Sequence, residues 1–313
     1  MTALRLALTE YVTIRRAFGT QLREPAVALG HFVEFLEREG AEFITTKLAL
    51  RWAQKPKRAQ RATWARRLTA VRGFATWLSP FERRTEVPPR GLLDARHRRN
   101  KPHIFSDQEI EQLMAQTSRL RSRTGLRALT YTTLIGLLAA TGLRPGEALA
   151  LDVADVDLQD GVLAIRQTKF GKSRFVPVED STRAALARYA KRRDTLCPWR
   201  RTDAFLVSER GARLPGGTAC WTFARVSSTI GLRGPAGRHI GRDPRLQDLR
   251  HTFATRRLVE WYRAGANVER EMPKLATYLG HSAIAHTYWY IEAVPELLQL
   301  ATERLMRQPG GGR

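Results

Sequence analysis

Residues 246–254 of the chain read LQDLRHTFA, residues 279–281 read LGH and residues 287–290 read TYWY. Gln247 and Arg250 are three residues apart, so on a helix their side chains share one face. Gly280 is typical of the residue that ends a helix, which leaves His281 at the break. Tyr290 follows nine residues after that histidine. This spacing predicts that an amide, a guanidinium, an imidazole and a phenol converge on one place.

A second motif lies upstream and contains an arginine between two predicted helices. Residues 141–149 read TGLRPGEAL. Proline is favoured at the first position of a helix, so Pro145 predicts that a new helix begins directly after Arg144. Glu147 then falls in the first turn of that helix, close enough to hold the Arg144 guanidinium. The string therefore predicts an arginine at a rigid corner between two helices.

Two lysines lie in a predicted turn. Residues 168–172 read TKFGK, and the flanking segments 162–167 and 174–178 are rich in residues that favour strands. The pattern predicts a hairpin with Lys169 at the entry of its turn and Lys172 at the exit. Lysines in turns are often only solvated, so the pattern alone leaves their role open.

The downstream strings resemble the C-terminal half of the tyrosine recombinase (phage integrase) family. The family pattern is His-x-x-Arg, then Leu-Gly-His, then a nucleophilic tyrosine nine residues after that histidine. The chain matches the pattern at Arg250, His281 and Tyr290. It departs from the pattern at Gln247, where the family usually has histidine. Tyr288, two residues before Tyr290, is the rival for the nucleophile.

The upstream strings extend the resemblance, so that it covers roughly residues 105–300. TGLRPGEAL is similar to the family segment that carries the first arginine, which is Arg144 here. TKFGK is similar to the hairpin turn that carries the family's lysine. Counting back from the end of the second strand places that lysine at Lys169, with Lys172 as the alternative. Four motifs in the expected order are far more specific than any one of them.

The resemblance implies a chemistry that suits these residue types. Cleavage of a phosphodiester by a tyrosine needs a nucleophile, donors that stabilise charge on the phosphate, and a proton for the leaving oxygen. Arginine offers a fixed fork of donors and stays charged, whereas lysine can act as a general acid. The implied product is a 3′-phosphotyrosine. The implied catalytic residues are Arg144, Lys169, Gln247, Arg250, His281 and Tyr290, with Glu147, Asp248 and His251 as supports.

The composition indicates the kind of partner. The chain of 313 residues has 53 Lys and Arg against 30 Asp and Glu, a formal net charge of +23. Such an excess predicts a polyanion, and we expect double-stranded DNA. Residues 1–103 contain 21 of the basic and 9 of the acidic side chains, so both halves of the chain are basic. No carboxylate cluster or His/Cys ligand set is evident, and we expect neither a metal nor another cofactor.

The sequence also predicts the compartment. Cys197 and Cys220 are the only cysteines, which excludes a disulfide framework and a thiolate zinc site. Residues 1–20 lack a signal-peptide pattern, and no apolar run reaches the length of a membrane span. We therefore expect a cytoplasmic protein that associates with the nucleoid and not with a membrane.

The chain is long enough for two domains, and we expect a mainly α (α+β) fold. Residues 1–82 show helical apolar spacing and are expected to form a helical domain. The resemblance implies that this is a DNA-binding (core-binding) domain. Residues 83–104, with Pro88-Pro89 and a basic cluster, are expected to form a linker. Residues 105–313 are expected to form a mixed helical catalytic domain with a small antiparallel β-sheet and a C-terminal amphipathic helix. Together the two domains would form a clamp around DNA.

The resemblance implies a site-specific DNA recombinase of the integrase or transposase type, from a mobile element. Two alternatives remain: a DNA-binding relative that has lost turnover, supported by Gln247, and a topoisomerase-like enzyme that nicks and closes strands. The resemblance further implies a homo-oligomer, as a tetramer, or a mixed assembly with related recombinases on DNA.

Overall fold

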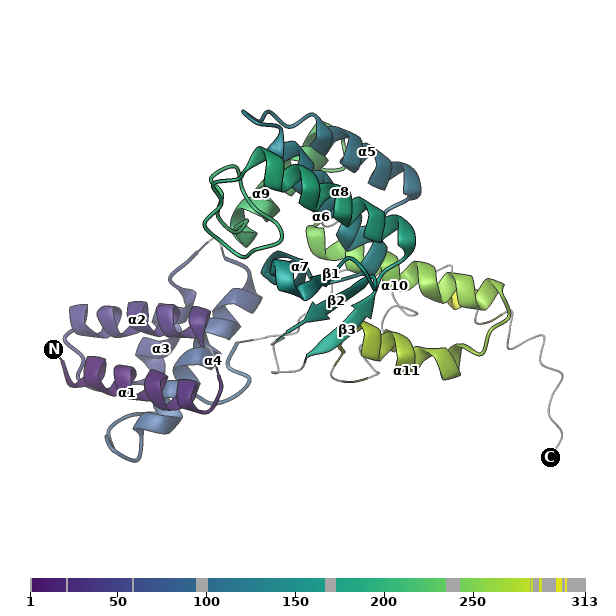
Figure 1. Ribbon diagram of the computed structural model, residues 1–313. Coiled ribbons are helices and arrows are strands. Elements are labelled where there is room, and N and C mark those ends of the chain that lie inside the picture. Colours follow the sequence, from purple (N-terminus) through teal and green to yellow (C-terminus); the bar gives the residue numbers. More distant parts are fainter. Residues whose placement is uncertain are drawn as a thin grey trace, which may run out of the picture. The chain divides into compact units, whose positions relative to one another are not determined.

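The computed structural model describes residues 2–20, 22–57, 59–93, 101–166, 173–234, 243–281, 283, 287–288, 297–299 and 302. Contacts within the chain divide it into two units, Met1–Arg99 and Asn100–Arg313. The boundary falls inside the segment predicted as a linker. Figure 1 labels the helices and strands of both units.

The described part of the first unit is helical, as its apolar spacing predicts. Leu29, Phe32, Val33 and Leu36 are all at most 1% exposed and form one buried stripe. The stripe packs against the other helices, and the Phe32 and Trp52 rings lie 5.1 Å apart. The helices are α1 (Ala3–Ala17), α2 (Arg23–Arg38), α3 (Thr46–Gln54) and α4 (Arg61–Leu78).

The first unit extends beyond α4 into the segment predicted as a linker. The Glu86 amide donates to the Ile44 carbonyl at 2.8 Å. The Arg72 side chain donates to the carbonyls of Pro88 and Pro89 at 2.7 and 2.8 Å. Prolines lack an N–H but keep a carbonyl acceptor, so this Pro-Pro pair is compatible with packing against a helix.

The second unit combines helices with one small sheet. The strands are β1 (Val156–Asp157), β2 (Val162–Ile165) and β3 (Arg174–Pro177), in the order β1-β2-β3 with antiparallel pairing. The helices are α5 (Asp107–Ser118), α6 (Leu126–Thr141), α7 (Pro145–Ala150), α8 (Asp180–Leu196), α9 (Gly216–Thr229), α10 (Leu246–Arg263) and α11 (Val268–Leu279), with a 3-10 helix at Val153–Asp155. The prediction of a mainly helical fold with a small antiparallel sheet is confirmed.

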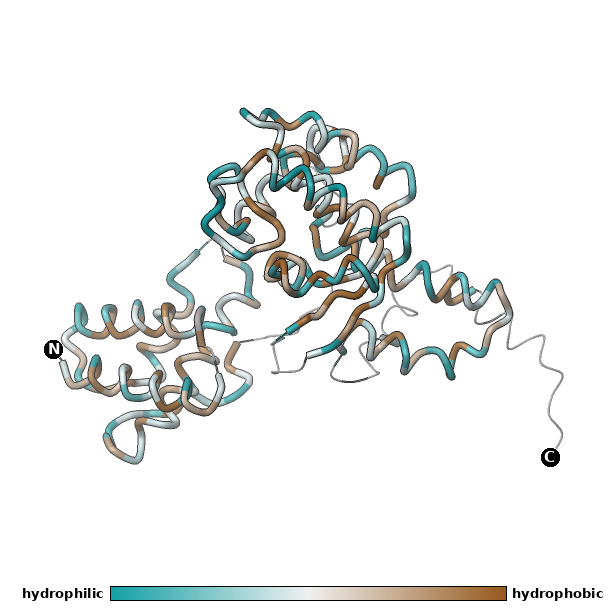
Figure 2. Tube along the Cα trace, viewed as in Figure 1, coloured by the Kyte–Doolittle hydropathy of each residue, from teal (hydrophilic) through white to brown (hydrophobic). Residues whose placement is uncertain are grey.

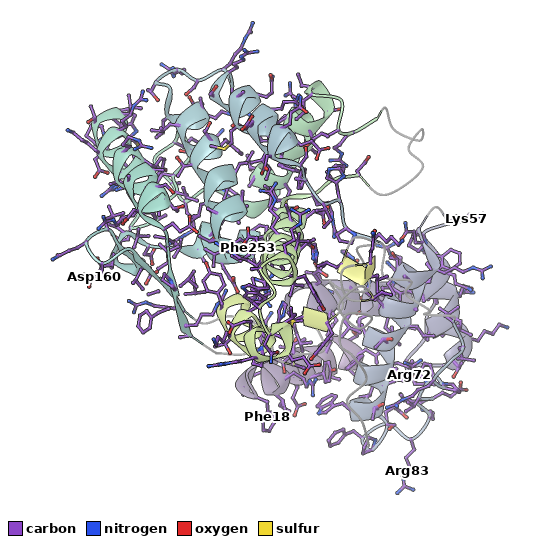
Figure 3. The ribbon with its side chains drawn as sticks, turned by 90° about the vertical axis from the view of Figure 1, so that its right-hand side faces the viewer. Phe18, Lys57, Arg72, Arg83, Asp160 and Phe253 are labelled. Atoms are coloured by element: carbon purple, nitrogen blue, oxygen red, sulfur yellow. The ribbon has the colours of Figure 1, made fainter. Side chains whose placement is uncertain are left out.

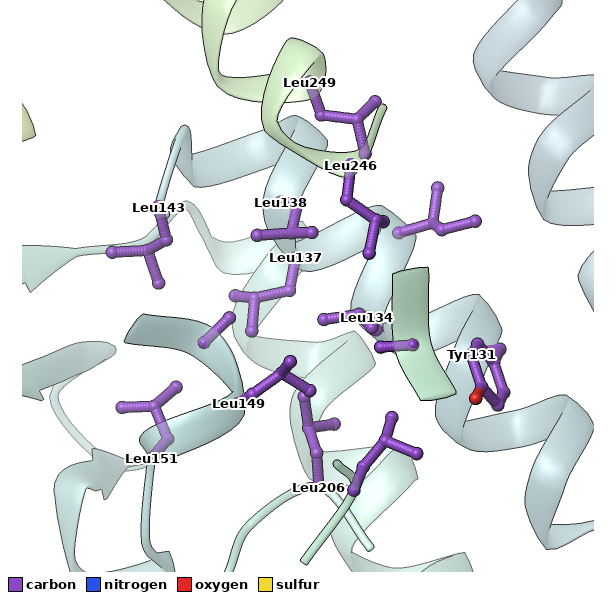
Figure 4. Close-up of a cluster of buried hydrophobic side chains, with 14 of the residues drawn as sticks. Tyr131, Leu134, Leu137, Leu138, Leu143, Leu149, Leu151, Leu206, Leu246 and Leu249 are labelled. Carbon is purple, nitrogen blue, oxygen red and sulfur yellow. The ribbon is translucent and has the colours of Figure 1, made fainter. Parts of the chain in front are cut away.

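Helix α6 is the centre of this unit because it is apolar on nearly every side. It packs against α5, α8 and α10. Leu134 and Leu138 of α6 are fully buried, and Figure 4 shows them together with Leu246 and Leu249 of α10. In Figure 2 the strands β2 and β3 are among the apolar parts of the chain, whereas α8 is mostly hydrophilic. The packing of α10 on α6 brings the LQDLRHTFA segment to the end of α6.

Only a short part of the predicted C-terminal helix is described. Residues 297–299 are helical, and Leu297 is fully buried in a cluster with Leu258 and Leu279 of its own unit. Leu298 is 48% exposed. Among the described residues, no helix is both long and apolar enough to cross a membrane.

Candidate active site

Two helix ends form the frame of the site. Helix α6 ends at Gly142, with φ +61°, and α11 ends at Gly280, with φ +67°. Both values lie in the left-handed region, where glycine avoids the steric cost of a Cβ atom. At Gly142 a Cβ atom would also lie 2.5 Å from the ring of Phe253, which Figure 3 labels on α10. Glycine is therefore required at this corner for two reasons.

Arg250 joins the two helix ends. Its Nη1 donates to the Gly142 carbonyl at 3.0 Å and its Nη2 to the Leu279 carbonyl at 2.6 Å. The last carbonyls of a helix have no partner within the helix, so these bonds satisfy groups that would otherwise be orphaned. Arg250 is 2% exposed. A buried guanidinium is stable only when it is hydrogen-bonded, so this side chain has one fixed position.

Arg144 lies at the corner that the Pro145 pattern predicts. Its Nη1 donates to Glu147 Oε1 at 2.7 Å, and its backbone amide donates to Glu147 Oε2 at 3.0 Å. Its Nη2 donates to the Gly280 carbonyl at 3.1 Å. The Arg144 side chain remains 35% exposed, whereas Glu147 is 8% exposed. The carboxylate thus anchors a guanidinium that still faces solvent.

Arg174 is the part of the site that the sequence pattern missed. Its Nε donates to the Tyr278 carbonyl at 2.7 Å. Its Nη1 and Nη2 donate to the two oxygens of Glu147 at 3.2 and 2.9 Å. The sequence gives no signal for its face because Phe175 and Val176 are both apolar. In the structure Phe175 is 76% exposed and Val176 is fully buried. Arg174 therefore belongs to the buried face of β3, where a charged residue needs partners.

Three guanidinium groups meet at the end of α11. The carbonyls of residues 278, 279 and 280 accept, in that order, from Arg174, Arg250 and Arg144. A helix C-terminus carries partial negative charge, which favours cations at this position. The carboxylate of Glu147 adds one full negative charge, so the group keeps an excess of positive charge beside residue 281. Such a group can attract and hold a phosphate.

His281 follows directly after these carbonyls. Its backbone amide donates to the Ala276 carbonyl at 2.9 Å. Its Nδ1 lies 2.7 Å from Thr287 Oγ1, and Thr287 is fully buried. The contact fixes the orientation of the ring. Tyr288, the next residue, is 45% exposed.

Three predicted residues cannot be placed. Tyr290, the predicted nucleophile, lies outside the described residues, and so do Lys169 and its alternative Lys172. The structure therefore describes the groups that would hold the phosphate and leaves the positions of the nucleophile and the general acid as predictions.

Comparison with known proteins identifies the family. The family model described as the phage integrase family matches residues 104–296.

The chain belongs to the phage integrase family.

Among curated relatives, y4rB of Sinorhizobium fredii, named as an integrase/recombinase, is 45% identical over 312 residues, 98% of each chain. The tyrosine recombinase XerD of Caulobacter vibrioides is 33% identical over 76% of this chain and 72% of its own. The resemblance to tyrosine recombinases that the motifs predict is confirmed.

Solved structures show the same fold at lower identity. The Tn1549 transposon integrase in complex with transposon right end DNA is 18% identical, with a TM-score of 0.63 over 98% of this chain and 99% of that chain. A lambda integrase tetramer bound to a Holliday junction is 17% identical, with a TM-score of 0.61 over 92% of this chain and 76% of that chain. At these identities the likeness shows the fold alone.

Gln247 and Asp248 occupy the first turn of α10. Gln247, at the family's usual histidine position, is half-buried. Asp248 is 1% exposed, and its Oδ2 accepts from the Arg245 amide at 2.9 Å, which closes a capping box at the start of the helix. Burial raises the pKa of Asp248 above its ordinary value. The Asp248 carboxylate therefore fixes the start of the helix that carries Arg250.

His251 is a neutral neighbour of the site at physiological pH. Burial lowers its pKa to about 4, and the positive charges of Arg250 and Arg245 lower it further in the same direction. A neutral imidazole beside Arg250 adds no further repulsion to a cluster of cations. Within the described part of the chain, no group of three or more His, Cys, Asp or Glu side chains is arranged to hold a metal ion.

Proposed function

We propose that this member of the phage integrase family is a site-specific DNA recombinase that cuts and rejoins strands through a 3′-phosphotyrosine on Tyr290. The observation that carries the proposal is the meeting of Arg144, Arg250 and His281 at the end of α11. The family membership and the spacing of Tyr290 from His281 support it further.

Arg144 is the group best suited to contact the scissile phosphate. A guanidinium has five N–H donors, and Arg144 uses two of its side-chain hydrogens in the bonds to Glu147 and Gly280. The remaining donors belong to a side chain that is 35% exposed. Donors that are fixed in advance stabilise developing charge more effectively than donors that must reorganise. Arg250 and His281 would complete the clamp on the non-bridging oxygens.

The covalent step balances without an external energy source. The Tyr290 phenolic oxygen attacks the phosphorus, the bond from phosphorus to the 5′-oxygen breaks, and the phenolic proton passes to a base. Lys169, or Lys172 in its place, gives a proton to the departing 5′-oxygen. The phosphotyrosine keeps the phosphodiester energy, so attack by another 5′-hydroxyl reverses the step and rejoins a strand.

Gln247 is the one observation in favour of an alternative function, that of a relative that binds DNA without turnover. A carboxamide can donate a hydrogen bond to a phosphate oxygen but cannot pass a proton at neutral pH, as an imidazole can. The retained donor supports an active enzyme, because stabilisation of the phosphate can survive the change. The topoisomerase-like alternative would use the same covalent step without a fixed target site.

We also propose the partners. The net charge of +23 is spread over both halves of the chain, which supports a clamp of the two units on double-stranded DNA. The lambda integrase relative is a tetramer on its DNA, and a homo-tetramer or a mixed assembly with related recombinases would place several active sites on one DNA. Such an enzyme would work in the cytoplasm at the nucleoid, on the ends of a mobile element.

Covalent capture tests the proposed function. The full chain is incubated with sheared genomic DNA that carries its gene and flanking element, denatured with detergent, and the DNA that stays attached is sequenced. We expect wild type, but not Tyr290→Phe, to recover fragments that share one sequence. Recovery of scattered fragments would instead indicate a topoisomerase-like enzyme. DNA retention only before denaturation would indicate a binding relative.

A further inference from the structure

Arg174 is held more tightly than a surface arginine. It opens β3 on the face that Val176 also occupies, and its side chain is 11% exposed. Its three hydrogen bonds go to one carboxylate and one carbonyl. The fork-to-fork geometry on Glu147 is the strong form of an arginine–carboxylate contact. An arginine held in this way has little capacity to contact DNA itself.

The partner of Arg174 is also the anchor of Arg144. Glu147 Oε1 accepts from Arg144 Nη1 at 2.7 Å and from Arg174 Nη1 at 3.2 Å. Burial by itself would raise the pKa of Glu147, but the hydrogen bonds and charges of the two arginines outweigh burial and keep that pKa below its ordinary value. The carboxylate is therefore ionised and fixed between two cations. Without Arg174, Glu147 could rotate and Arg144 would lose its fixed direction.

The second contact of Arg174 is at the end of α11. Its guanidinium crosses directly over Gly280: a Cβ atom there would lie 2.8 Å from Arg174 Nη1 and 3.0 Å from Cζ. The glycine of the Leu-Gly-His string thus provides space for Arg174 as well as a left-handed turn. His281 is the next residue. The Arg174 side chain therefore contacts Glu147, which holds Arg144. It also contacts the end of α11, which is followed directly by His281.

We infer that Arg174 is a positioning residue for strand cleavage, which orients Arg144 through Glu147 and His281 through the end of α11. This inference rests on the proposed recombinase function. Arg174 acts on the groups that hold the phosphate, and it does so independently of the proton that Lys169 would deliver. Lys169 lies between β2 and β3 in the sequence, five residues before Arg174, so the two effects must be separated by experiment.

Single-turnover cleavage of a nicked suicide duplex, built on the sequence recovered by covalent capture, tests the inference. We expect Arg174→Ala to cleave about 100-fold more slowly, the scale of a displacement of about 1 Å in an active site, with unchanged affinity for the duplex. Arg174→Lys keeps the charge but loses the fork, and should fall between Arg174→Ala and wild type. Glu147→Gln combined with Arg174→Ala should be no slower than the slower single variant.

A sulfur at the 5′-bridging position distinguishes the two routes. Sulfur leaves without protonation, so it should restore the rate of Lys169→Ala but leave Arg174→Ala slow. Arg183→Ala is the matched control, because Arg183 also contacts one carbonyl and one carboxylate, those of Gln159 and Asp180. It should cleave like wild type.

Three results would overturn the inference while wild type remains active. They are a wild-type rate for Arg174→Ala, a loss of DNA affinity that matches the loss of rate, or full restoration of Arg174→Ala by sulfur. If Arg174→Ala does not fold, the comparison of Arg174→Lys with wild type on both substrates decides the same question. If wild type forms no covalent adduct, the proposed function has failed and not merely the role of Arg174.

Discussion

Gly280→Ala probes the close packing of Arg174 against the end of α11. Alanine at φ +67° enters the left-handed region, which costs an L-residue roughly 1–2 kcal/mol. The new methyl group would also lie 2.8 Å from Arg174 Nη1, so the guanidinium must withdraw. Loss of one hydrogen bond between charged groups removes about 1.5–3 kcal/mol. We therefore expect a total destabilisation of about 2.5–5 kcal/mol.

Gly265→Ala is the control for the free-energy cost of placing alanine in the left-handed backbone conformation. Gly265 has φ +68°, and no atom of the residues that the structure describes lies within 4 Å of a Cβ built there, so alanine would carry the conformational cost alone. In thermal unfolding, the transition of the second unit should fall by roughly 3–12 °C more for Gly280→Ala than for Gly265→Ala, at about 2–4 °C per kcal/mol. Cleavage of the suicide duplex should slow only for Gly280→Ala. Equal transitions and equal cleavage for the two variants would refute the close approach of Arg174.

Further variants test single chemical roles. Lys169→Ala should cleave an ordinary duplex slowly and a 5′-bridging sulfur duplex at nearly the wild-type rate; an equal defect on both would remove Lys169 as the general acid. Gln247→Ala should be slower than wild type and Gln247→His at least as fast, and single-turnover rates decide this; a wild-type rate for Gln247→Ala would show that the side chain takes no part. Burial holds the pKa of His251 near 4 in the folded chain, against about 6.5 when unfolded. The unfolded state therefore binds more protons as pH falls from about 6.5 to 4, and stability declines over that window. In His251→Gln this decline should be shallower, and melting temperatures across pH that run parallel to wild type would contradict the shift. Because Asp248 is present in both proteins, its opposite contribution cancels in the comparison.

The spacing of residues in the sequence predicted those parts of the site that depend on residues nearby in the chain. Arg250 faces the end of α6 because α10 is a helix in that register, and Arg144 lies at a corner because Pro145 begins α7. Gly280 ends α11 in the left-handed conformation that the Leu-Gly-His string predicts. Each of these features depends on residues within one or two helical turns, which a single sequence displays directly.

The contacts of Arg174 could not be read in this way. Its carbonyl partner is 104 residues away in the sequence and its carboxylate partner 27 residues away. The packing of β3 beside α11 brings Arg174 to its carbonyl partner, and Glu147 comes from a further element, α7 (Figure 1). Phe175 and Val176 are both apolar, so the sequence shows neither which face of β3 is buried nor what Arg174 meets there.

The predicted linker makes a contact of a different kind. Pro88-Pro89 disfavours a regular helix or strand, and the sequence therefore predicts a linker. The carbonyls of both prolines nevertheless accept hydrogen bonds from Arg72 of α4. Irregular backbone can pack on a helix whenever a long polar side chain reaches its carbonyls, and composition does not reveal that contact.

Identification of the residue that becomes linked to DNA is the direct test of a phosphotyrosine on Tyr290. The wild-type adduct is digested with nuclease and protease, and the peptide that carries the nucleotide is sequenced by mass spectrometry. We expect a 3′-phosphate of the cleaved strand on the Tyr290 oxygen, and no adduct in Tyr290→Phe. Attachment at Tyr288, or cleavage that leaves no residue linked to DNA, would contradict it.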